Sequence, residues 1–172
     1  QPPIIVGGPQ VSNFKGNSAN GTWQVALGLE HRLGAFASSD HRSNNLSYGG
    51  VYVKNLNRKE IFDAIDARRS TAATDKIFME FSCNGNLMGE EFETEDAPEF
   101  KIVVHGTAPI SKVTLVKNEV DYEVWEPSSY DSDFTMNFKD KKPEPGDYRY
   151  YIRVEQVDGN MGWTSPVWVQ VR

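Results

Sequence analysis

The sequence has little cysteine, little histidine and no excess of basic charge. Its 172 residues include one cysteine, Cys83, and three histidines. A single cysteine excludes a disulfide within the chain, and its apolar surroundings in FMEFSC indicate a buried thiol. Lysine and arginine together number 18 against 24 acidic residues, and they form no basic stripe. Because a protein needs such a stripe to neutralise a phosphate backbone, we expect no nucleic-acid partner.

Long hydrophobic runs are also absent. No segment approaches the roughly 18 apolar residues that a membrane-spanning helix needs. The first residues, QPPIIVGGP, lack the charged and then apolar pattern of a signal peptide. With 38% hydrophobic residues, the chain can still bury a core. We therefore expect a soluble, folded chain with no membrane span.

Apolar and polar residues alternate after residue 74, which is the period of a half-buried strand. In the segment 147–156, this alternation places Tyr150 and Ile152 on a dry face and Tyr151 and Arg153 on a wetter one. Turn signals separate eight such segments. The predicted strands span residues 76–83, 86–93, 100–107, 111–118, 120–126, 133–139, 147–156 and 165–172. Strands of this length and spacing predict a β-sandwich, Ig-like or fibronectin-like, over residues 75–172.

The pattern before residue 74 is different. Residues 1–20 are rich in Gly, Pro, Asn and Ser, which predicts a loop. Residues 22–34 have a helical period, and the apolar run at 34–38 predicts a strand. The dipeptide Asp40-His41 then falls at the end of a strand that follows a helix, which is where α/β folds carry their ligand sites.

A second strand and a second helix are predicted further along this part, at residues 49–55 and 57–69. Asn57 is the expected N-cap of the helix, and Glu60 completes a capping box with it. The apolar side chains at helical spacing predict the buried face of this helix. They are Ile61, Phe62, Ala64 and Ile65.

Several motifs carry a family resemblance. The segments GPQVSNFKG, LGAFASSDHRS, RRSTAATD, LMGEEF and HGTAPISKVTLVKN resemble the C-terminal part of a large family of bacterial proteins. The catalytic portion of that family is similar to the polymerase-and-histidinol-phosphatase (PHP) superfamily of metal-dependent phosphoesterases. The match runs from about Gly8 to the C-terminal WTSPVWVQV.

The resemblance implies a distorted (β/α) barrel that holds divalent metals with His, Asp and Glu side chains from several strand ends. It places Asp40 and His41 at the last metal-ligand motif, for Zn, Mn or Fe. Arg42, next to them, could clamp a substrate phosphate or acid or equally pair with a nearby carboxylate. Carboxylate and imidazole are ordinary ligands for these metals. The alternative for the isolated chain is that Asp40 caps a turn and His41 is an exposed polar side chain.

The metal site is incomplete within this sequence. The remaining histidines, His31 and His105, each stand alone, and a closed barrel needs about 200 residues or more. We therefore expect an α+β, mainly β chain, in which residues 1–74 are the last strand–helix units of a PHP-like barrel and residues 75–172 are an accessory sandwich. Its expected partners are the missing N-terminal barrel portion and a small phosphoester.

Two hypotheses about function follow. In the first, the chain is the C-terminal fragment of a metal-dependent hydrolase and is inactive alone, in a bacterial cytoplasm, periplasm or secreted location. In the second, it is a β-sandwich module that contacts glycan or protein through exposed aromatic rings. One aromatic cluster is interpreted as core rather than as such a platform. It consists of Tyr148, Tyr150, Tyr151, Trp163 and Trp168. A further alternative is self-association through surfaces that missing strands would cover.

Overall fold

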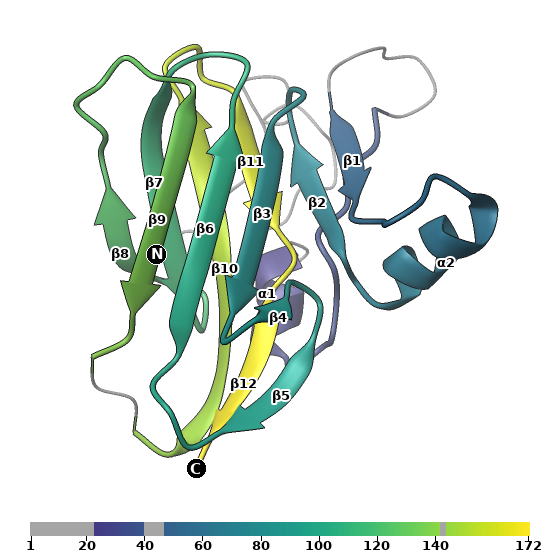
Figure 1. Ribbon diagram of the computed structural model, residues 1–172, viewed down its shortest axis with the longest axis vertical. Coiled ribbons are helices and arrows are strands. Elements are labelled where there is room, and N and C mark those ends of the chain that lie inside the picture. The colour runs from purple at the N-terminus through teal and green to yellow at the C-terminus, as the bar shows by residue number, and fades with distance from the viewer. Residues whose placement is uncertain (1–22, 40–46, 142–143) are drawn as a thin grey trace.

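The longest strand, β10, organises the larger of two β-sheets in the computed structural model (Figure 1). The structure describes residues 23–39, 47–141 and 144–172. Within these residues the helices are α1 (Trp23–Gly28) and α2 (Arg58–Asp66). The strands are β1 (Tyr48–Val51), β2 (Ser70–Ala73), β3 (Phe78–Cys83), β4 (Asn86–Leu87), β5 (Glu91–Thr94), β6 (Glu99–His105), β7 (Ile110–Lys117), β8 (Val120–Trp125), β9 (Asp133–Lys139), β10 (Gly146–Gln156), β11 (Met161–Thr164) and β12 (Val167–Val171).

The larger sheet has the strand order β1-β2-β11-β10-β12-β5, and β7 joins it by pairing with both β10 and β8. All its described pairings are antiparallel except that of β12 with β5. The smaller sheet has the order β4-β3-β6-β9 and is antiparallel throughout. The predicted mainly β architecture is therefore confirmed.

The two sheets pack face to face around one apolar core. Alternate residues of β3 and β6, among them Phe81 and Ile102, meet alternate residues of β7, β10 and β12. The rings of Phe100 on the smaller sheet and Tyr150 on the larger one lie 4.7 Å apart between their centroids. Because each strand directs every second side chain into this layer, the alternation in the sequence predicts the sandwich.

Most of the predicted strands correspond to observed ones. The segment 86–93 divides into β4 and β5, and the short strand β11 was not predicted. The predicted turn at residues 83–86 joins β3 to β4, with Asn84 (φ 48°) and Gly85 (φ 81°) in the left-handed region. Asn and Gly are the residues that adopt this conformation most readily, which explains why the hairpin could be predicted.

The part before residue 74 does not form the predicted barrel units in the residues described. β1 and β2 flank α2 but pair antiparallel, with Tyr48 opposite Ala73, whereas a strand–helix–strand unit of a (β/α) barrel has parallel strands. β2 also pairs with β11, so these strands extend the larger sheet of the sandwich across the predicted boundary at residue 74. The segment 34–38 is not a strand in the structure.

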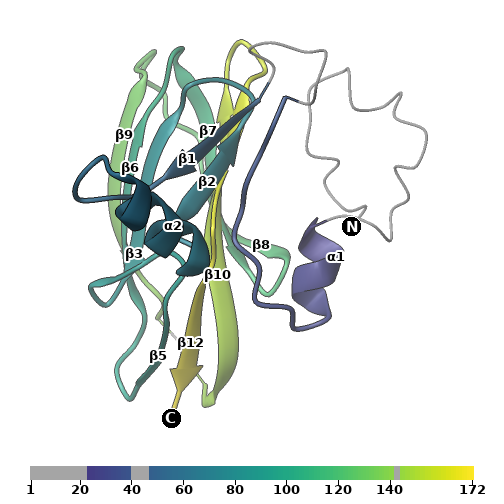
Figure 2. The ribbon, with the colours of Figure 1, turned by 90° about the vertical axis from the view of Figure 1, so that its right-hand side faces the viewer.

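Helix α1 and the segment after it cover the outer face of the larger sheet (Figure 2). α1 ends at Gly28, earlier than the helical period predicts, and Glu30 follows with a positive φ of 65°. Leu27 and Ala35 pack against Tyr151, Trp163 and Trp168 in a second apolar cluster. The face of β10 that was predicted to be wetter is therefore buried too, because an element from outside the sandwich covers it.

Candidate binding face

The residues predicted from the family resemblance, Asp40, His41 and Arg42, lie outside the described part of the structure. The residues on either side of the segment 40–46 are described. The Ser39 hydroxyl donates to the Ser47 carbonyl at 2.9 Å, and the Ser47 amide donates back to Ser39 Oγ at 3.3 Å. The two ends of the segment are thus held together next to β1, at one edge of the larger sheet.

Among the residues that the structure describes, neither of the other two histidines belongs to a group that could hold a metal ion. His31 is exposed, and Nδ1 of His105 lies 2.8 Å from a carboxylate oxygen of Asp133 on the neighbouring strand. Over the described ranges, no group of three or more His, Cys, Asp and Glu side chains is arranged to hold a metal ion. No described helix is long and apolar enough to span a membrane.

Four of the five aromatic residues predicted as core are buried, and the fifth, Tyr148, is partly buried and packs against the core. Tyr150 and Tyr151 have no exposed surface, and Trp163 and Trp168 are 2% and 5% exposed. The acidic stretch of β5 is engaged by basic side chains, since Glu91 pairs with both Arg32 and Arg68, and Glu93 pairs with Arg172. These two features are therefore part of the fold.

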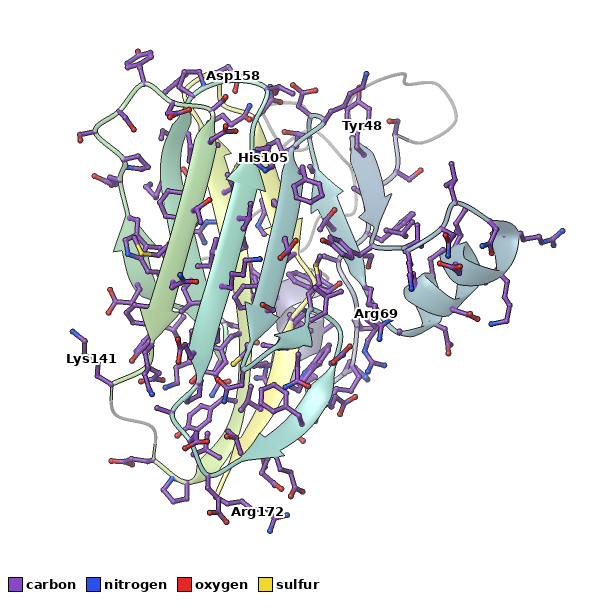
Figure 3. All side chains as sticks on the ribbon, in the orientation of Figure 1. Tyr48, Arg69, His105, Lys141, Asp158 and Arg172 are labelled. Carbon is purple, nitrogen blue, oxygen red and sulfur yellow. The ribbon has the colours of Figure 1, made fainter. Side chains whose placement is uncertain are left out.

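The outer face of the smaller sheet faces solvent in the described part of the structure. We call it the open face and define it by the outward side chains of β3, β6 and β9. They are Phe78, Glu80, Ser82, Glu99, Lys101, Val103, His105, Asp133, Thr135, Asn137 and Lys139. In Figure 3 this sheet lies toward the viewer, with His105 labelled near the end of β6. Its counterpart on the larger sheet is partly covered by α1 and the segment after it.

Three rings form a row at one end of the open face. Phe78 on β3 lies between Tyr52, which follows β1, and His105 on β6. The ring centroids of Phe78 and Tyr52 are 6.3 Å apart, and those of Phe78 and His105 are 5.6 Å apart, with interplanar angles of 43° and 33°. The Phe78 side chain is 45% exposed, although a large apolar residue is usually withdrawn from water. We call these residues the aromatic row.

Hydrogen bonds hold the aromatic row in place. The Tyr52 hydroxyl donates to Glu80 Oε2 at 2.6 Å, and Lys101 Nζ donates to Glu80 Oε1 at 2.9 Å. The bond from Tyr52, followed by that from Lys101, lowers the pKa of the Glu80 carboxyl. The same bond is the largest cause of the raised pKa of Tyr52. Glu80 is therefore a carboxylate at neutral pH, with its two oxygens directed by an aromatic hydroxyl and an ammonium group.

A hollow of about 790 Å³ adjoins the open face at its other end. Its lining includes the open-face residues Ser82, Lys101 and Asn137. The β3–β4 turn adds Asn84 and Asn86, and the segment after β5 adds acidic Asp96. The volume lies in the range of small-ligand sites, which is about 300–1,000 Å³. The open face thus combines exposed rings at one end with a polar hollow at the other.

The strands 76–83 and 100–107 were predicted, but no residue of this face was predicted as part of a site. Phe78 and His105 point away from the core on β3 and β6. The register that places them opposite each other, and the approach of Tyr52 from a different sheet, follow from tertiary packing.

No protein-family profile matches the sequence. An uncharacterised protein of Chlamydia trachomatis serovar D is 28% identical over 165 residues, which cover 86% of this chain and 27% of that protein. An uncharacterised protein of Chlamydia muridarum is 27% identical over 167 residues, with the same coverage of both chains. The chain thus spans about a quarter of the length of these curated relatives.

Two solved structures are similar over about half of the chain. The fibronectin(III)-like modules of Clostridium thermocellum CbhA are 20% identical, with a TM-score of 0.37, and the match covers 54% of this chain and 97% of that one. The CARDB domain of PF1109 from Pyrococcus furiosus is 17% identical, with a TM-score of 0.38, and the match covers 56% and 95%. The β-sandwich assignment rests on the strand pairing and shared core of the chain itself.

Proposed function

We propose that the chain is a β-sandwich binding module of a longer protein and that its open face binds a glycan. The aromatic row carries this proposal. Phe78, flanked by Tyr52 and His105, exposes a ring surface next to fixed hydrogen-bonding groups. A sugar ring has the matching chemistry, because its C–H faces pack on aromatic rings while its hydroxyls bond to carboxylate and ammonium groups.

The composition of the open face favours a glycan over a protein partner. The cores of protein–protein interfaces are depleted in charged residues, whereas the open face carries Glu80, Lys101 and Asp133 at or beside the aromatic row. Acidic and basic groups occur together on it, which favours an uncharged ligand over an anionic one. The polar hollow next to the strands supplies further amide and carboxylate groups for hydroxyls.

A glycan array tests the proposal directly. The chain is expected to bind a set of neutral oligosaccharides, and Phe78→Ala is expected to weaken that binding at least about tenfold, the change that a lost ring contact of about 1.4 kcal/mol produces. Tyr130→Ala is the matched control, since Tyr130 is an aromatic residue that is 87% exposed and belongs to a loop outside the open face. Absence of any glycan binding, or equal loss in both variants, would contradict the proposal.

A second function is proposed for the longer protein, namely metal-dependent hydrolysis of phosphoesters with Asp40 and His41 among the metal ligands. Its support is the resemblance of the sequence motifs around Asp40 and His41 to those of PHP proteins. Metal content of the longer protein, measured by elemental analysis, is expected to fall in Asp40→Ala and to stay unchanged in Asp63→Ala, an exposed helical carboxylate. Equal metal in all three proteins would contradict this role.

A further inference from the structure

Helix α2 leaves its largest apolar side chains exposed. Phe62 is 60% exposed and Ile65 is 46% exposed, and Leu56, just before the helix, is 88% exposed. Only Ala64 is buried among the residues of this helix. Figure 1 shows α2 beyond β1, off the side of the sandwich rather than on the face of either sheet. The predicted buried face is therefore wrong for Phe62 and Ile65, whereas Ala64 is buried and Ile61 is half-buried. We call Leu56, Phe62 and Ile65 the α2 apolar face.

The chain itself supplies local stabilisation for α2. The Asn57 side chain accepts from the Glu60 amide at 2.9 Å, which confirms Asn57 as the N-cap. The Glu60 carboxylate accepts from the Asn57 and Asn55 side chains, while the Asn57 backbone amide donates to the Asn55 carbonyl, so Asn57 and Glu60 form a box-like pair and not a full capping box. Lys59 pairs with Asp63 one turn along. Caps and surface pairs of this kind help a nine-residue helix, but helices in proteins derive most of their stability from packing an apolar face.

We propose that the α2 apolar face docks against the part of the longer protein that lies outside these 172 residues. The length of the relatives supports this occupant, because the matching region makes up only 27% of each Chlamydia protein. A second copy of the chain is disfavoured by the net charge of −6, which repels like chains. Residues 1–20 are disfavoured by their low apolar content.

The surroundings of the α2 apolar face suit an interface between two parts of one protein. Charged side chains border it, including Lys59 and Asp63 on the same helix, and the guanidinium of Arg58 lies 5.6 Å from the Phe62 ring centroid. An apolar centre with a polar rim is the ordinary composition of such interfaces. The proposal is independent of glycan binding, which concerns the other side of β1 and is measured on this chain alone.

The test compares Phe62→Glu/Ile65→Glu in two contexts. In the 172-residue chain, the thermal midpoint is expected to shift by no more than about 2 °C, because both side chains already contact water. In the longer protein, protease cleavage between its parts is expected to become at least about tenfold faster, because two charges would enter an apolar interface. Tyr130→Glu/Val157→Glu, at two exposed apolar loop residues of the sandwich, is the control and is expected to change neither measurement.

Three results would overturn the proposal. Unchanged cleavage of the longer protein would mean that nothing docks on α2. Unfolding of the 172-residue chain by the two charges would mean that the chain itself covers the face. A dimer of the 172-residue chain that the charges dissociate would assign the face to a second copy. If the longer protein with Phe62→Glu/Ile65→Glu does not fold, Phe62→Ala/Ile65→Ala replaces it. The same measurements are made on this variant, and smaller changes are expected.

Discussion

Lys117 Nζ lies 2.6 Å from Oδ2 of Asp140, a side chain with no exposed surface at the end of β9. Tyr122 and Tyr150 also donate hydroxyl hydrogen bonds to this carboxylate, at 2.7 and 2.9 Å. Asp140 follows the smaller sheet, whereas the three donors belong to the larger one. The group therefore joins the two sheets at one end of the sandwich and is satisfied by an ammonium group and two phenols.

Removal of Asp140 is expected to destabilise the chain strongly. Asp140→Leu would leave the Lys117 ammonium, which is 17% exposed, without its counter-charge, at a cost of about 3–5 kcal/mol in the free energy of unfolding. The double variant Asp140→Leu/Lys117→Met is expected to recover at least about half of that loss, because the Lys117 charge is removed together with its counter-charge. Urea denaturation measures both. A single-variant loss below about 1 kcal/mol would contradict the role given to the pair.

Three tyrosines with raised pKa values, the buried Tyr150 and Tyr151 and the partly exposed Tyr122, predict loss of stability at high pH. Burial, and then the hydrogen bond to Asp140, raises the pKa of Tyr122 to about 12, and burial raises the pKa of Tyr151 to about 12. The pKa of Tyr150 is raised still further, mainly by burial. Because these values exceed the 10 of an unfolded tyrosine, the stabilisation is complete below pH 10 and is lost as the pH rises toward 12.

Parallel measurements of the free energy of unfolding and of tyrosinate absorbance between pH 9 and about 12 check this window. Tyr150 and Tyr151 are expected to ionise together with unfolding. Ionisation of these two tyrosines near pH 10 in a chain that stays folded would be the opposite result.

A fragment of residues 75–172 is expected not to fold stably. It lacks β2, which pairs with β11, and α1, which covers Tyr151 and Trp163. Its larger sheet would therefore gain a free edge and an exposed aromatic face. Circular dichroism and solution mass are expected to report aggregation or loss of the cooperative transition. A monomeric fragment with the thermal midpoint of the whole chain would instead place a true domain boundary at residue 74.

Gly89 is expected to be essential for the junction between the part of the chain before residue 74 and the part after it. Its φ of 93° is one that side chains rarely adopt, and a Cβ there would collide with the backbone of Ala67 and Arg68. Its carbonyl also accepts from Arg68 Nε at 3.2 Å. Gly89→Ala is expected to cost about 2 kcal/mol or more in the free energy of unfolding.

The matched control is Gly85→Ala in the β3–β4 turn. Gly85 has a similar φ of 81°, but no atom lies within 4 Å of the added Cβ. Gly85→Ala is therefore expected to lower the free energy of unfolding only by the conformational cost of about 1 kcal/mol. Equal losses in the two variants, measured by thermal unfolding, would show that contact with residues 67–68 does not matter.

The sandwich could be predicted because its signals are local. Alternation marks β3, β6 and β10, and Asn84-Gly85 marks a hairpin, each within one short segment. The role of residues 23–73 could not be predicted in this way. A helical period at α2 and an apolar run at 34–38 suggest α/β units, but only non-local pairing of β2 with β11 shows that this part extends the sandwich.

The binding face was predicted only in outline. The hypothesis of exposed rings on the sandwich named no residues, and the aromatic cluster in β10 to β12 is core. Phe78 resembles any other outward strand residue in sequence, and Tyr52 reaches it from an element predicted to belong to another domain. The aromatic row depends on how the two sheets pack together, and local sequence patterns do not encode this packing.

The most direct test of the proposed function is an NMR titration of the labelled chain with the best neutral oligosaccharide from the array. The amide signals that shift are expected to map to β3, β6 and β9, centred on Phe78 and His105. These shifts are expected to be absent when the same amount of oligosaccharide is added to Phe78→Ala. A saturable set of shifts on the larger sheet or on α2, with the open face unchanged, would contradict the account.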